Sequence, residues 1–294
     1  MKERSVIMND IQFNDILDER EKVTEPLRQL QMVELRLLRI FDRICKKYNL
    51  IYWLDGGTIL GAVRHGGFIP WDDDIDVAMP LEDYNKFLRI APNVLPHDIL
   101  LQCRDLTCGY TKKFTKLMDR YSTLIENKDT LCDDCFRGIY LDIFPMISYP
   151  ALSEKNTIYF VKKIAKYQYL KDSYVRISPG RIKDYCKFSF LLLFYQFLWK
   201  IVSMRKGDYI SNIPEDNGYH IRHQKSEIYP LGKIFFENYL FNAPADPDAY
   251  LKALYGDYMK LPPKEKQYSH ALYFNALKKY PHPEGLLWNN KMSK

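Results

Sequence analysis

The sequence predicts an α+β fold, in which helices flank a β-sheet and a helical insertion interrupts the sheet-forming region. Three observations carry this prediction. Apolar residues recur at helical spacing over 27–48, between arginines and glutamates, which is typical of an amphipathic helix. Residues 74–79 and 138–145 alternate polar and apolar side chains, as strands do. Residues 151–210 are rich in lysine and surround the apolar run 188–204, which favours further helices.

Shorter patterns fill in the order of elements between these segments. The run LIYWL (50–54) predicts a buried strand, which the turn residues Asp55-Gly56-Gly57-Thr58 end. Helical spacing resumes in ILGAVRH (59–65) and ends at the next glycine pair. We also expect a helix over 81–90 and a strand over 113–118.

Composition narrows the class of protein. The chain has 294 residues, of which 47% are hydrophobic and 15% aromatic, so it can bury a sizeable core and is not expected to be disordered. Its net charge is +6, yet no run of lysine and arginine is interleaved with aromatic residues, so no nucleic-acid partner is expected. The N-terminal stretch lacks the pattern of a secretory signal, which predicts a cytoplasmic protein.

Four of the six cysteines form the pairs Cys103-x4-Cys108 and Cys132-x2-Cys135. A structural zinc ion would accept four such ligands. The loose spacing of the first pair favours ordinary reduced cysteines instead, which suits a cytoplasmic chain.

The apolar run 188–204 has two interpretations. Its 17 residues include Gln196 and Lys200, so it is shorter than the ~20 apolar residues that a membrane span needs. We favour a helix buried in the protein. The alternative is peripheral contact with the inner face of a membrane, supported by the flanking basic residues Arg176, Arg181, Lys183, Lys187, Lys200, Arg205 and Lys206.

A glycine turn and three strand aspartates are the candidate site. Gly56, Gly57 and Thr58 open a helix directly after a strand, where backbone N–H groups and a hydroxyl can bind phosphate. Asp74 and Asp76 share one strand face, about 7 Å apart. Asp142 lies in a strand that can neighbour theirs, so three carboxylates can hold Mg²⁺, with Mn²⁺ as the alternative ion, beside a phosphate.

The neighbouring aspartates admit other interpretations. Asp72, Asp74 and Asp76 imitate the start of an EF-hand loop, but Val77 occupies the position that requires glycine. We therefore interpret Asp72 and Asp73 as turn residues that orient the pair after them.

The quoted motifs together resemble one family. "WLDGGTILGAVRHGGFIPWDDDIDVAMP" (53–80) is similar to the signature of the LicD family, whose members include phosphocholine transferases and the fukutin-type proteins. "FTKLMD", "GIYLDIFP", "EIYPLGKIFFENYLFNAPADPDAYL" and "YGDYM" follow in the family's order, so the resemblance covers roughly residues 27–263. It implies a nucleotidyltransferase-like fold built on a mixed sheet.

The resemblance also implies the four regions of the chain and their roles. We expect an N-terminal extension (1–26), a nucleotidyltransferase-like catalytic core (27–150), a helical insertion (151–225) and a C-terminal segment that completes the domain (226–294).

The implied activity is transfer of a phosphoalcohol, such as phosphocholine, from a CDP-linked donor to a sugar hydroxyl of a glycan or lipid-linked glycan. Asp74, Asp76 and Asp142 would be the catalytic and metal-binding residues. The residues expected at the donor phosphate are Gly56, Gly57, Thr58, Arg64, His65 and Lys116. For Arg64 and His65 a helix-capping role is the alternative, and for Lys116 it is a solvated strand lysine.

Two rival functions stay open at this level. The first is a nucleotidyltransferase that makes a CDP-alcohol from CTP, and the second is a catalytically silent glycan-binding module. An aromatic cage for a quaternary ammonium is a further hypothesis. Packing in the core is the favoured interpretation of its candidates, which are Tyr239, Phe241, Tyr250, Tyr255 and Tyr258.

Overall fold

The computed structural model of the chain describes residues 11–107, 110, 112–126, 136–173, 181–215 and 221–281. Its helices are η1 (Arg20–Lys22), α1 (Pro26–Lys47), α2 (Gly56–His65), α3 (Leu81–Val94), α4 (Glu154–Asp172), α5 (Ile182–Val202), α6 (Lys225–Ile228), α7 (Pro247–Tyr255) and η3 (Lys264–Lys266). Its strands are β1 (Trp53–Leu54), β2 (Asp76–Pro80), β3 (Ile99–Gln102), β4 (Thr115–Asp119), β5 (Thr123–Glu126), β6 (Tyr140–Pro150), β7 (Lys206–Asn212), β8 (His223–Gln224), β9 (Gly232–Phe236), β10 (Tyr239–Ala243) and β11 (Ala271–Asn275).

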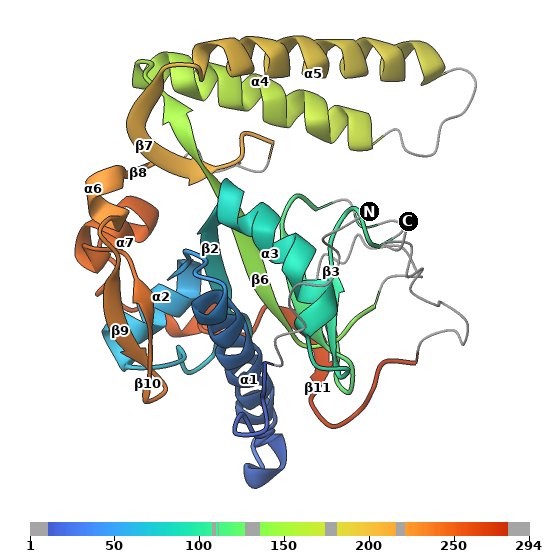
Figure 1. Cartoon of the computed structure of the whole chain (residues 1–294), viewed down its shortest axis with the longest axis vertical. Helices are drawn as coiled ribbons and strands as arrows, with labels where there is room; N and C mark the ends of the chain where they lie inside the picture. The colour runs from blue at the N-terminus through green and yellow to red at the C-terminus, as the bar shows by residue number, and fades with distance from the viewer. Residues whose placement is uncertain are drawn as a thin grey trace, which may run out of the picture.

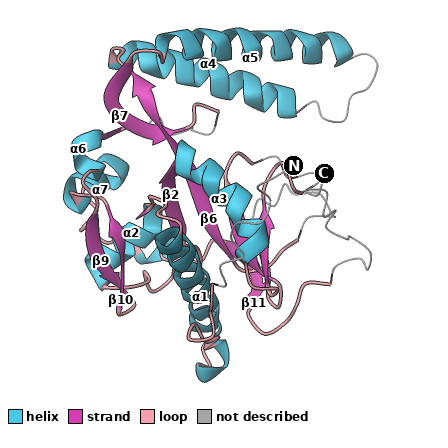
Figure 2. Cartoon of the chain, in the orientation of Figure 1, coloured by secondary structure: helices cyan, strands magenta, loops and turns pink. Residues whose placement is uncertain are grey.

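A mixed sheet organises the molecule, which confirms the α+β prediction. Its strands follow the order β1-β2-β6-β4-β3, and β7 joins the far half of β6 and carries β8 beside it. The pair β2–β6 is parallel and the other pairs in this sheet are antiparallel. Helices α1 and α3 lie in front of the sheet in the view of Figure 1, and the hairpins β9–β10 and β5–β11 lie at its sides (Figures 1 and 2).

The long helix α1 follows from local sequence. Glu25 caps it by accepting hydrogen bonds from the N–H groups of Leu27 and Arg28, and Pro26 begins it with a suitable φ. Its apolar face, which includes Leu30 and Phe41, is buried against the sheet. The helix predicted over 27–48 is therefore confirmed.

Most of the other predicted elements also form, since α2, α3, β4 and β6 overlap the segments predicted for them. The strand predicted over 50–54 is shorter, and the two residues before it make hydrogen bonds to side chains. The N–H of Ile51 donates to Asp83, and the Tyr52 hydroxyl donates to Asp42. Asp74 lies before β2 rather than inside it, so it does not share a strand face with Asp76.

Helices α4 and α5 lie within the range 151–225 and pack into a hairpin at one end of the molecule (Figure 1), whereas β7 and β8 of the same range join the main sheet. A second apolar cluster, with Tyr149, Ile164, Leu192 and Trp199, joins them to β6. Only Leu192 and Trp199 of the apolar side chains of α5 are buried, so the favoured interpretation of 188–204 as a buried helix is wrong for most of its length. By length and composition alone, α5 is also the one helix of the described chain that qualifies as a candidate membrane span.

Of the four cysteines in the predicted pairs, only Cys103 lies among the described residues. Cys103 is buried and free, whereas Cys108, Cys132 and Cys135 lie outside the described residues. The zinc alternative therefore stays a prediction.

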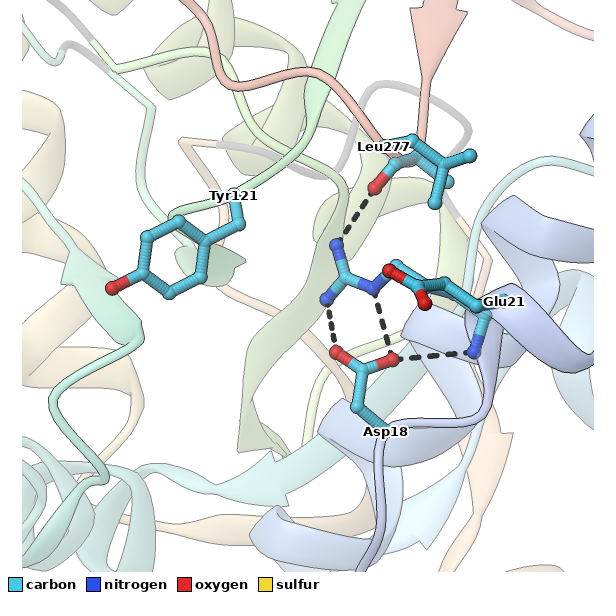
Figure 3. A pocket seen from close by; sticks show the side chains of 6 residues that line it. Asp18, Glu21, Tyr121 and Leu277 are labelled. Atoms are coloured by element: carbon cyan, nitrogen blue, oxygen red, sulfur yellow. Dashed lines mark hydrogen bonds and ion pairs between the residues drawn. The ribbon is translucent and has the colours of Figure 1, made fainter.

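A buried ion pair ties the N-terminal segment to the sheet. The Arg20 guanidinium donates to both carboxylate oxygens of Asp119, at 3.0 and 2.5 Å, and to the carbonyl of Ala276 at 2.7 Å. Arg20 lines a cavity of about 400 Å³, in which Tyr121 lies across from Asp18 and Leu277 (Figure 3). These contacts join η1, the end of β4 and the end of β11, and we interpret them as structural.

We expect Asp119→Asn to lower the free energy of unfolding by about 1–3 kcal/mol, because the buried guanidinium loses its buried charged partner and keeps only the more exposed carboxylate of Asp18. Urea unfolding followed by circular dichroism measures this. The control is Lys22→Met, which removes an exposed pair with Glu19 and should change stability by less than about 1 kcal/mol. Equal effects of the two substitutions would contradict the structural role of Arg20–Asp119.

Candidate active site

A cavity of about 370 Å³ opens where α2, the loop before β2 and the C-terminal segment meet. Its walls combine acidic, basic and aromatic side chains. The residues that line it include Gly57, Arg64, Trp71, Asp72, Asp74, Asp76, Tyr255, Tyr258, Lys260 and His270.

The parallel pairing of β2 and β6 brings the strand aspartates together. Asp76 and Asp142 are direct partners in the register, as predicted from their alternating patterns. The hydroxyl of Thr58 accepts the N–H of Asp76 at 2.7 Å, which links the start of β2 to the first turn of α2. Thr58 is itself buried, so the structure places its side chain at the base of the site rather than on the cavity wall.

The two glycines allow the close approach of α2 to these carboxylates. A Cβ atom on Gly56 would lie 2.5 Å from Oδ2 of Asp76, and one on Gly57 would lie 2.7 Å from Oδ2 of Asp72. Gly56 also has a φ of +54°, which favours glycine. The requirement for glycine here is therefore contact with carboxylates, in addition to any contact with phosphate.

Asp73 joins the C-terminal segment to the site. Its carboxylate accepts hydrogen bonds from the Ser269 hydroxyl and from the N–H groups of His270 and Ala271, at 2.7, 2.9 and 2.6 Å. This holds His270 opposite Asp72 and Asp74, and one ligand atom from each of these three residues lies within 4.8 Å of the others. Asp73 thus positions residues of the C-terminal segment rather than the pair Asp74 and Asp76, whereas Asp72 belongs to the acidic group itself.

Burial and mutual repulsion make this group electrostatically costly without a cation. Burial, followed by the charges of Asp74 and Asp73, raises the pKa of Asp72 to about 8. Burial, with Asp74 and Asp142, raises the pKa of Asp76 well above its usual range. A divalent cation would offset this repulsion, and carboxylate oxygens are the ligands that Mg²⁺ prefers, so the residues present fit a metal.

A further carboxyl group lies below the aspartates, on α1. Glu34 is fully buried, and neither of its oxygens has a hydrogen-bond partner among the described residues. Burial, and then the charges of Asp74 and the neighbouring aspartates, raises the pKa of Glu34 well above its usual range. Burial thus favours the neutral form of the Glu34 carboxyl group.

Lys116 is placed differently from its prediction. It is 1% exposed, so the alternative of a solvated strand lysine is wrong. Its ammonium group contacts Asp142 at 2.9 Å and Glu126 at 3.0 Å, and it lies 3.1 Å from the centre of the Tyr140 ring. Burial raises the pKa of Asp142 to about 6, and the charge of Lys116 limits that rise.

A buried network supports the turn before α2. The Tyr250 hydroxyl donates to Asp55 at 2.6 Å and accepts from the indole N–H of Trp53 at 3.1 Å. Asp55 in turn accepts the N–H of Gly56 at 2.8 Å. The ring of His223 stacks on Tyr250, with centroids 3.7 Å apart.

The structure brings some predicted residues to the cavity and not others. Gly57, Arg64, Asp74 and Asp76 line it, with Asp142 beside Asp76 in the sheet. His65 is exposed and lies outside the cavity lining, with its ring 6.4 Å from that of Trp71.

Of the aromatic candidates, Tyr255 and Tyr258 line the cavity. Tyr250 and Phe241 are in the core, as the favoured interpretation holds. Tyr239 contacts Arg39 elsewhere on the surface.

The sequence-based prediction of the site did not include Glu34, Trp71, Lys260 and His270, and it gave Asp72 an orienting role only. Asp72 had a detectable signal, because it precedes Asp74 by two residues as Asp74 precedes Asp76. Glu34 has the pattern of a helix residue, and His270 lies almost 200 residues from the aspartates, so no local pattern marks either.

Comparisons with known proteins identify the family of the chain. Residues 49–178 match the family model described as LicD/FKTN/FKRP, nucleotidyltransferase domain. The chain is 30% identical over 258 residues to the lipopolysaccharide cholinephosphotransferase LicD of Haemophilus influenzae, an alignment that covers 83% of this chain and 95% of that protein. The chain belongs to the LicD family.

Two further members of the LicD family match over shorter lengths. The human ribitol 5-phosphate transferase FKRP is 62% identical over 32 residues, which are 11% of this chain and 6% of FKRP. The human ribitol-5-phosphate transferase FKTN is 28% identical over 100 residues, which are 34% of this chain and 19% of FKTN. The resemblance seen in the motifs is thus confirmed.

We expect Gly57→Ala to weaken divalent-ion binding of this LicD-family chain without unfolding it. The new Cβ displaces the Asp72 carboxylate, whereas alanine in a helix is up to about 1 kcal/mol more favourable than glycine. Calorimetric titration with Mn²⁺ and thermal melting measure the two effects.

Gly66→Ala is the control with the opposite pattern. Gly66 has a φ of +73° and open space around it, so the substitution should cost stability and leave ion binding unchanged. Unchanged ion affinity in Gly57→Ala would contradict the contact with Asp72.

The buried His223 makes stability depend on pH. Burial lowers its pKa to about 4, below the usual value of 6.5, so the unfolded chain binds more protons between these values. The contribution of neutral His223 to the free energy of unfolding should be fully present above pH 6.5. It should be lost, by up to about 3 kcal/mol, as the pH drops to 4.

His223→Phe keeps the stack on Tyr250 and should flatten this pH dependence, measured by urea unfolding at several pH values. The exposed His97, changed to Gln, is the matched control and should leave the slope as in the wild type. An unchanged slope in His223→Phe would refute the assignment.

Proposed function

We propose that this protein is a metal-dependent transferase that moves a phosphoalcohol from a CDP-activated donor to a sugar hydroxyl of a glycan. The observation that carries the proposal is the convergence of Asp72, Asp74 and Asp76 on a cavity that also contains Arg64 and Lys260. The family relatives named above, which transfer phosphocholine or ribitol phosphate, support the same class of reaction.

The residues divide the work of binding. Asp72, Asp74 and Asp76 would hold Mg²⁺, with Asp142 beside them, and the imidazole of His270 would also suit Mn²⁺. A bound ion would neutralise the donor phosphates and stabilise the charge that develops during transfer. Arg64 and Lys260, which line the same cavity, would contact the phosphates, and Gly57 lets the α2 backbone approach them.

The transfer forms one P–O bond and breaks another. The acceptor hydroxyl oxygen bonds to the phosphorus that carries the alcohol, and the bond from this phosphorus to the oxygen of the CMP group breaks, which releases CMP. The hydroxyl proton passes to a carboxylate of the site. Asp72, Asp74 and Asp76 line the cavity and are the candidate acceptors of this proton.

The aromatic wall points to the alcohol. Trp71, Tyr255 and Tyr258 line the same cavity, and aromatic rings are the usual partners of a quaternary ammonium. We therefore rank phosphocholine first among the donors to test.

We expect CDP-choline with Mg²⁺ to raise the melting temperature more than CMP, CTP, CDP-ribitol or CDP-glycerol does. A ligand at about 100 times its dissociation constant stabilises the native state by about 2.7 kcal/mol. Asp76→Asn should abolish this shift, leave the melting temperature without metal nearly unchanged, and lower turnover by about 100-fold or more.

Asp184→Asn, on the exposed surface of α5, is the control and should behave as the wild type. Product analysis separates the rivals, since transfer releases CMP whereas synthesis of a CDP-alcohol from CTP releases pyrophosphate. A fully active Asp76→Asn enzyme would refute the metal assignment. Glycan binding without any nucleotide-dependent shift would favour the silent binding module.

A further inference from the structure

Helix α5 has two apolar faces, of which one is covered. Leu192 and Trp199 point into the small core shared with α4 and β6. A second set recurs every three or four residues along the helix and faces away from the protein. Its members are Phe190, Leu193, Phe194, Phe197, Ile201 and, just beyond the helix, Met204.

The side chains of this second set are large and apolar, yet they are highly exposed to solvent. Phe190, Leu193 and Phe197 are 68%, 65% and 61% exposed. Single exposed apolar residues are common, but a continuous stripe along about four turns marks a contact surface. We call this stripe, from Phe190 to Met204, the outer face of α5.

The charge around the outer face identifies what covers it. Basic side chains are exposed on both helices of the hairpin and at its ends, at Lys155, Lys162, Lys166, Arg181, Lys183, Lys187, Lys200, Arg205 and Lys206. The exposed acidic residues of the same segment are fewer, namely Glu154, Asp184 and Asp208. A second copy of the hairpin would bring like charges together, whereas anionic lipid headgroups complement them.

The geometry favours a helix that lies on a bilayer rather than one that crosses it. Although α5 is long and apolar enough to span, its inner face packs on α4, whose own length carries several lysines. Its end is followed after three residues by β7, which pairs Lys206 with Pro150 of β6. A crossing would have to separate α5 from both partners.

We propose that the outer face of α5 and its flanking lysines bind the surface of a bilayer that contains anionic lipid, with the helix axis parallel to the membrane plane. The apolar stripe enters the headgroup boundary and the basic side chains contact lipid phosphates. The hairpin lies at the end of the molecule beyond β7 (Figure 1), so this contact leaves the cavity between α2 and the C-terminal segment open. The proposal does not depend on the reaction proposed above.

Co-sedimentation of the full chain with vesicles tests it. We expect the wild type to sediment with vesicles of phosphatidylcholine plus phosphatidylglycerol, and less with phosphatidylcholine alone. Leu193→Glu/Phe197→Glu should lower binding by about tenfold or more, because two apolar contacts are replaced by like-charged groups at an anionic surface. Lys183→Glu/Lys187→Glu should lower binding to the anionic vesicles selectively.

Phe235→Glu is the matched control, because Phe235 is equally exposed, at 63%, but lies on β9. It should bind vesicles as the wild type does, and all variants should keep the wild-type melting temperature. Two results would overturn the proposal: wild type that stays in the supernatant with anionic vesicles, or a Leu193→Glu/Phe197→Glu variant that still binds them. Wild type that elutes as a dimer and does not bind vesicles would show that a second copy covers the outer face instead.

Discussion

The parallel pairing of β2 with β6 is the constraint on which the site depends. It places Asp76 directly beside Asp142 in the sheet, and the hydroxyl of Thr58 ties the same strand start to α2. Carboxylates in neighbouring strands of a buried sheet repel each other, and their raised pKa values express that cost. The surrounding elements either offset this repulsion, as Lys116 does for Asp142, or leave room for a cation.

The C-terminal segment completes the site from a distance along the chain. Asp73 accepts three hydrogen bonds from residues 269–271, and the Tyr250 hydroxyl donates to Asp55. Both contacts fasten late residues to the short stretch between β1 and β2. The aspartates and the C-terminal residues of the site, such as His270, therefore come together only when both parts of the chain have folded.

Local sequence predicted the parts of this arrangement that depend on periodicity. The alternation of polar and apolar residues placed Asp76 and Asp142 on strands, and helical spacing located α1. Asp72 belongs to the acidic group because of the shape of the loop before β2, and no periodic pattern predicts the shape of a loop. His270 reaches the site through tertiary contacts with Asp73, which cannot be inferred from either segment alone. The exposure of α5 was only the alternative interpretation of 188–204, because a helix that is apolar all round has no period to show which side is covered.

Strand β6 joins two regions that are otherwise separate. Asp142 lies near its beginning, and Pro150, at its end, leads into the α4–α5 hairpin. Eight residues of extended chain span about 26 Å at ~3.3 Å per residue. With the hairpin resting on a bilayer, β6 would act as a spacer that sets how far above the lipid the acceptor hydroxyl is modified. On a lipid-linked glycan, the distance of a sugar from the lipid anchor would then decide whether that sugar is modified. The chemical identity of the anchor would not matter.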